Sequence, residues 1–141
     1  MILLDTNVLS ELMRPDPHTG VVAWVDQWPV DELAVTTITV SEVLFGLERL
    51  EEGLRRRRLE SVARTMFEEE FRGRILPFDL RAAEAYATLA AHRMAEGHPI
   101  SMADAQIAAI ARTRNAALAT RNIRDFSGLS LELFDPWEAG R

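Results

Sequence analysis

The chain of 141 residues contains no cysteine and no lysine. Without cysteine, neither a disulfide framework nor a thiolate metal site can form. No apolar run approaches the roughly 20 residues that a membrane-spanning helix needs, and no basic segment precedes the apolar start, as it would in a signal peptide. We therefore expect a cytoplasmic protein without a membrane segment.

The composition indicates one globular domain over residues 1–141. Hydrophobic residues make up 48% of the chain and charged residues 27%, which is the balance of an ordinary domain with a real core. The net charge of −6 argues against a nucleic-acid partner. Two features weaken that objection: all sixteen basic residues are arginine, which forms strong forks with phosphate, and a bound metal ion would neutralise some of the acids.

Short apolar runs alternate with helical patterns along the whole chain. This alternation predicts an α/β fold with a mainly parallel central sheet flanked by helices. The proline at position 77 makes a central place for the third strand doubtful. The expected strands are residues 1–4, 33–38, 74–78, 116–120 and 131–134.

Four acidic residues stand where a strand ends or a helix begins: Asp5, Glu42, Asp104 and Asp125. Asp5 directly follows the first strand. Each of the others comes three residues after a cap-forming residue, in the spacing of a capping box. The cap residues are Thr39, Ser101 and Asn122. Taken singly, each acid has a structural explanation as a helix cap.

Taken together, the four acids predict a common site. The carboxyl ends of parallel strands share one edge of the sheet, which is where ligands bind in such folds. Four neighbouring carboxylates repel one another, and Mg²⁺ or Mn²⁺ would relieve that repulsion. Such a cluster is typical of metal-assisted phosphoester hydrolysis, in which a metal-activated water attacks the phosphate.

Other polar features are best interpreted as structural. His18, His92 and His98 have no ligand or triad spacing, and Asp79 has the position of a helix cap. The run Arg55–Arg58 is interpreted as a solvated helix face, with a phosphate contact as the sharper alternative.

Four motifs and the tail recur in one known family. They are residues 1–7 (MILLDTN), 39–43 (TVSEV), 101–109 (SMADAQIAA), 119–126 (ATRNIRDF) and 135–137 (DPW). By these motifs the sequence resembles the PIN-domain ribonucleases, and more narrowly the VapC-type toxins of type II toxin–antitoxin systems, including the FitB-like subgroup. The motifs run in the family's order over nearly the whole chain. Asp135 stands where the family more often has Asn.

The resemblance implies a PIN fold and a metal-dependent endoribonuclease that acts as a toxin. By analogy, Asp5 and Asp104 bind Mg²⁺ or Mn²⁺ most directly, whereas Glu42 and Asp125 act partly through water. Thr6, Asn7 and Thr120 would support the carboxylates or the attacking water.

The resemblance also implies partners. It suggests a homodimer, RNA as substrate, and a small antitoxin whose C-terminal segment fills the groove, often with an arginine that reaches the acids. Higher assemblies would form with the antitoxin, and operator DNA would be bound only through it.

Two rival interpretations remain open. The acids could form a non-catalytic groove that docks a basic peptide. Alternatively, Asp5 could be a nucleophile that becomes phosphorylated. Such sites usually have a second Asp two residues later, where this chain has Asn7, and a lysine, which this chain lacks.

Overall fold

The computed structural model describes residues 1–139. Five parallel strands form one sheet in the order β3-β2-β1-β4-β5. The strands are β1 (Ile2–Leu4), β2 (Leu33–Thr36), β3 (Ile75–Leu76), β4 (Ala117–Ala119) and β5 (Leu133–Phe134). Each lies within its predicted range, and β3 is an edge strand, as the proline after it suggested.

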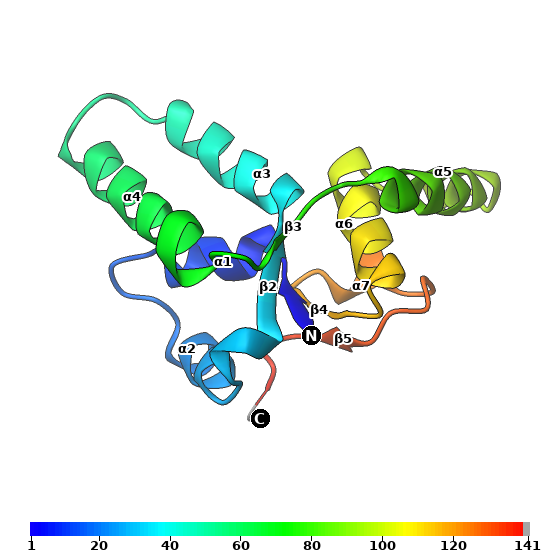
Figure 1. Cartoon of the computed structure of the whole chain (residues 1–141), viewed down its shortest axis with the longest axis horizontal. Helices are drawn as coiled ribbons and strands as arrows, with labels where there is room; N and C mark the ends of the chain where they lie inside the picture. Colours follow the sequence, from blue (N-terminus) through cyan, green and yellow to red (C-terminus); the bar gives the residue numbers. More distant parts are fainter. Residues whose placement is uncertain (140–141) are drawn as a thin grey trace.

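Helices cover both faces of this sheet (Figure 1). Those before β3 are α1 (Thr6–Leu12), α2 (Thr19–Asp26), the short 3₁₀ helix η1 (Val30–Glu32), α3 (Thr37–Glu48), α4 (Leu54–Thr65) and the π-helical turn η2 (Met66–Glu70). Those after it are α5 (Leu80–Ala95), α6 (Met102–Thr113) and α7 (Ile123–Phe126). The α/β class with a parallel sheet is confirmed.

Alternating strand residues divide the core into two clusters. Leu3 of β1 points to the face covered by α5 and α6, where it packs with Leu89 and Ile107. Its neighbours Ile2 and Leu4 point to the opposite face, covered by α1, α2, α3 and α4. A strand that is buried on both faces consists of consecutive apolar residues. For this reason, apolar and polar residues do not alternate at the start of the chain.

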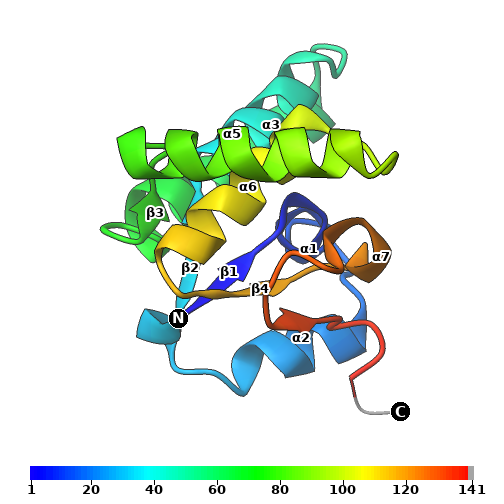
Figure 2. The ribbon, with the colours of Figure 1, turned by 90° about the vertical axis from the view of Figure 1, so that its right-hand side faces the viewer.

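The sheet brings the starts of α1 and α7 together. Figure 2 shows both helices at the same end of the sheet, beyond the carboxyl ends of β1 and β4. Helix α6 packs along α5, so the two form a hairpin on one face. That packing places the beginning of α6 near this end of the sheet.

Within residues 1–139, every helix is too short or too polar to cross a membrane.

Candidate active site

Asp5 is the most buried acid of the chain, with 3% of its surface exposed. It continues β1 by one residue, since its backbone N–H donates to the carbonyl of Ala119 on β4 at 2.9 Å. It is also the N-cap of α1, because its Oδ1 accepts from the N–H of Thr6 at 2.8 Å. The capping role and the candidate site therefore coincide in one residue.

Side chains from the end of β4 and the start of α1 hold the Asp5 carboxylate. The Thr120 hydroxyl, just past β4, donates to Oδ2 at 2.8 Å, and the Asn7 amide donates to the same oxygen at 3.2 Å. The side-chain oxygen of Asn7 in turn accepts a hydrogen bond from the backbone N–H of Arg121 at 3.2 Å. This network links the first and fourth strands at their carboxyl ends.

Glu42 reaches the same place from α3. Its Oε1 accepts from the Thr6 hydroxyl at 2.6 Å, and Thr6 also lies 3.1 Å from the hydroxyl of Thr39. The expectation that Thr39 caps this helix is wrong. The N-cap is Thr36, whose hydroxyl accepts from the N–H of Thr39 at 3.1 Å.

The correction has a physical reason. Thr37 and Ile38 are β-branched and therefore favour a strand, yet Thr36 already has the extended backbone and short hydroxyl that begin a helix. Glu42 therefore lies in the second turn of α3 rather than at its third position. Thr39 is fully buried instead, as part of the hydroxyl network that links α1 to α3.

Asp104 stands in the first turn of α6. Ser101 is the N-cap, and its hydroxyl accepts from the N–H of Asp104 at 3.2 Å, as the sequence predicted. The helix macrodipole favours a negative charge at this position. Half-burial and the neighbouring charges of Asp125 and Glu42 nevertheless raise the pKa of Asp104.

Asp125 belongs to α7, a helix of one turn that begins directly after Asn122, where the sequence predicted a cap. Asn122 occupies the N-cap position, but its side chain makes no capping bond; its carbonyl accepts the N–H of Asp125 at 3.0 Å. Arg93, which the sequence did not single out, holds this segment. Its guanidinium donates to the Asp125 carbonyl at 3.0 Å and to the Ser127 carbonyl at 3.2 Å.

The four acids act on one another electrostatically. The pKa of Asp5 is raised to about 6, mainly by burial and to a smaller extent by the charges of Asp104 and Glu42, against the lowering effect of the hydrogen bonds from Thr120 and Thr6. Asp104 in turn lies near enough to Asp125 and Glu42 to be affected by both. The structure thus brings all four predicted acids into one neighbourhood.

The donor chemistry fits a hard divalent cation. Among residues 1–139, no three carboxylate or imidazole groups already form a closed ligand shell. Mg²⁺ does not require one, since it is usually held by one or two carboxylates and keeps several waters. Asp5 and Asp104, whose pKa values are raised by burial and by neighbouring acids, are the two residues that could provide such carboxylates.

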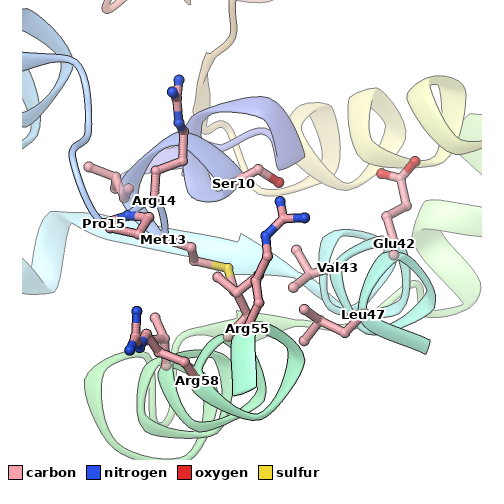
Figure 3. Close-up of a pocket in the computed structure, with 13 residues that line it drawn as sticks. Ser10, Met13, Arg14, Pro15, Glu42, Val43, Leu47, Arg55 and Arg58 are labelled. Atoms are coloured by element: carbon pink, nitrogen blue, oxygen red, sulfur yellow. The ribbon is translucent and has the colours of Figure 1, made fainter. Parts of the chain in front are cut away.

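A groove opens beside Glu42, between α1, α3 and α4 (Figure 3). It encloses about 660 Å³. Its lining is mostly aliphatic, with arginines from α4 and from the end of α1. The lining residues are Ser10, Leu12, Met13, Arg14, Pro15, Glu42, Val43, Gly46, Leu47, Arg55, Arg58, Leu59 and Val62.

The residues assigned to structural roles behave as such. His18 is the N-cap of α2, where its ring accepts from the N–H groups of Gly20 and Val21. Asp79 caps α5 through a bond from the N–H of Ala82 at 3.0 Å. Both assignments are confirmed, and neither side chain belongs to the acidic neighbourhood.

The family model for the PIN domain matches residues 2–130. The chain belongs to the PIN domain family. It is 39% identical to "VapC ribonuclease Y4jK" of Sinorhizobium fredii over 138 residues, which cover 98% of this chain and 99% of that one. It is 38% identical to "Toxin FitB" of Neisseria gonorrhoeae over 137 residues, covering 97% and 99%.

Solved PIN domain structures have the same fold. A chain in the structure of FitAB bound to an IR36 DNA fragment superposes with a TM-score of 0.92 at 37% identity, over 100% of this chain and 99% of that one. A chain of the DNA-bound VapBC from Salmonella typhimurium gives 0.82 at 22% identity, over 96% and 97%. The second likeness concerns the fold alone.

Proposed function

We propose that this PIN domain protein is an endoribonuclease that depends on Mg²⁺ or Mn²⁺ and is the toxin of a type II toxin–antitoxin system. The observation that carries the proposal is the buried carboxylate of Asp5 at the end of β1, with Asp104 and Glu42 close enough to raise its pKa. Near full-length relatives named as a VapC ribonuclease and as a toxin support the activity.

The residues of the site have different roles in this proposal. Asp5 and Asp104 would hold the metal ion, while Glu42 and Asp125 would contact it through water. The bound cation would activate water and stabilise the charge that develops on a phosphodiester. Thr120, Asn7 and Thr6 fix the carboxylate oxygens through the bonds described above, so that little reorganisation is needed when RNA arrives. The products would carry a 5′-phosphate and a 3′-hydroxyl.

The proposed partner is a small antitoxin, supported by the likeness to a chain in the FitAB complex. Its C-terminal segment would occupy the groove between α1, α3 and α4 and bring an arginine to the acids at the Glu42 end. Operator DNA would be reached through the antitoxin.

The toxin is also proposed to be a homodimer. Large apolar side chains exposed on α3, α5 and α6 supply a surface for it; they are Leu44, Phe45, Leu80, Met94 and Met102.

The decisive experiment is Mn²⁺ titration calorimetry on the antitoxin-free protein, combined with cleavage of total cellular RNA. We expect Asp104→Asn to lose both metal binding and cleavage. The matched control is Asp79→Asn, which removes the same charge from a helix start while keeping an efficient cap. This variant should retain both.

Three results would contradict the proposal. Full cleavage by Asp104→Asn would remove that residue from the site. Absence of Mn²⁺ binding by the wild type would instead leave a non-catalytic acidic groove that docks a basic peptide. A phosphoryl group trapped covalently on Asp5 would favour the nucleophile mechanism.

A further inference from the structure

The four consecutive arginines at the start of α4 have three different environments. Arg56 turns inward, with 13% of its side chain exposed, and pairs with Glu48, Glu52 and Glu60 at 3.1 to 3.2 Å. Arg55 and Arg58 line the groove. Arg57 is exposed and lies outside the groove lining. One run of identical residues therefore contains one structural arginine and two that face a potential ligand.

The presence of an arginine at position 55 does not stabilise helix α4. Helix α4 begins at Leu54, and its N-cap Gly53 forms no side-chain capping bond. Cations in the first turn are disfavoured by the positive end of the helix macrodipole. Three carboxylates offset this cost for Arg56. Within residues 1–139, neither Arg55 nor Arg58 takes part in an ion pair of that kind.

The groove that these arginines border is suited to a peptide. Its floor is aliphatic and includes Leu12, Val43 and Leu47, and none of its lining residues within the described part of the chain is aromatic. Surfaces that bind single-stranded RNA usually offer aromatic rings on which bases stack. A groove of aliphatic side chains instead receives the apolar face of an amphipathic peptide segment.

Positive and negative side chains lie on different sides of the groove. Figure 3 shows Arg55 extending from α4 toward Ser10 of α1, while Glu42 lies at the other side, on α3. Arg14, at the α1 rim, already has Glu11 as its partner at 3.3 Å. The cationic positions left for an incoming ligand are therefore those on α4, and the acidic position is the one next to the candidate active site.

We propose that Arg55 and Arg58 select the segment that occupies this groove by its carboxylate side chains. The occupant is an amphipathic protein segment with acidic residues where it passes α4 and none where it reaches Glu42. This charge pattern determines both which partner is accepted and in which direction it lies. The inference rests on the proposed function for the identity of the occupant, which is the antitoxin.

The test uses peptides selected from a random library displayed on phage against the wild-type protein. We expect the selected sequences to combine apolar residues at helical spacing with glutamate or aspartate. The selected peptides are then synthesised, and their affinities are measured for the double variant Arg55→Gln/Arg58→Gln and for the control variant Arg57→Gln. Since exposed ion pairs contribute modestly, we expect about a tenfold loss for the double variant. The control should match the wild type, and only the double variant should show a weaker salt dependence.

Several outcomes would overturn the inference. Selected peptides without acidic residues would do so, as would equal losses for the double variant and Arg57→Gln. A raised KM for RNA in the double variant, with unchanged peptide affinity, would assign the two arginines to phosphate instead. Failure of the proposed function is separate, since it would appear as absence of Mn²⁺-dependent RNA cleavage by the wild type, whatever the peptides do.

Discussion

Replacing Asp5 with Asn should make the metal-free protein more stable at neutral pH while removing metal binding. Asp5 is 3% exposed, and its pKa rises from 3.8 to about 6 mainly because burial disfavours the charged form. At about 1.4 kcal/mol per pH unit, keeping Asp5 ionised costs roughly 3 kcal/mol. Asn carries no charge. Its NH₂ group in place of Oδ2 can donate to the Thr120 hydroxyl, which then accepts instead of donating, but it cannot accept the bond from Asn7, a loss of about 1 kcal/mol.

The net gain is therefore about 2 kcal/mol in the free energy of unfolding above pH 7. The sign of the pH dependence follows from the raised pKa. Between pH 3.8 and about 6 the folded wild type binds the Asp5 proton more tightly than the unfolded chain, so this carboxyl lowers the stability progressively as the pH rises through that window. Below the window its effect vanishes.

The assay is urea denaturation of the wild type and Asp5→Asn in EDTA at pH 4 and pH 7.5. The difference between the two proteins isolates Asp5 from all other titrating groups. It should be about 2 kcal/mol in favour of the variant at pH 7.5 and close to zero or slightly reversed at pH 4, where little of the ionisation cost remains while the lost bond persists. Added Mn²⁺ should stabilise only the wild type. An Asn variant that is less stable at pH 7.5, or a difference independent of pH, would refute the reasoning.

Three further predictions concern the candidate site, the core and the proposed dimer surface. Thr120→Val removes a donor that lowers the pKa of Asp5, so half-maximal Mn²⁺ binding should move to higher pH in calorimetric titrations; an unchanged profile would contradict this. Leu89→Ala, at a side chain 2% exposed beneath α5, should lower the free energy of unfolding by about 2–5 kcal/mol in urea titrations. Phe45→Asp, which places a charge on an exposed apolar residue, should shift the mass measured by light scattering from dimer to monomer, whereas a mass equal to the wild type's would exclude this face from the interface.

Sequence patterns predicted the strands well because the signals were local. Buried parallel strands require continuous apolar runs, and the chain offers them at β1, β2 and β4, the three inner strands of the sheet. The edge position of β3 followed from Pro77, which cannot donate to a neighbouring strand. The helix start at Ser101 followed from its capping-box spacing to Asp104.

The start of α3 shows where local signals fail. Three threonines at positions 36, 37 and 39 are all possible caps, and all favour strand as well. Only tertiary packing decides that Thr36 begins the helix and that Thr39 is buried against Thr6. Similarly, the short helix α7 depends on Arg93, which reaches it from α5 through backbone carbonyls that no sequence pattern reveals.

The sequence by itself determined the fold class and the identity of the four acids, because both depend on residue type and spacing along the chain. Only the tertiary structure decided how these acids influence one another. The burial that raises the pKa of Asp5 and the hydroxyl and amide donors that hold it depend on how the ends of β1 and β4 meet helices α1, α3, α6 and α7. The division of Arg55–Arg58 into one arginine paired with three glutamates and two at the groove depends likewise on how α4 packs against its neighbours.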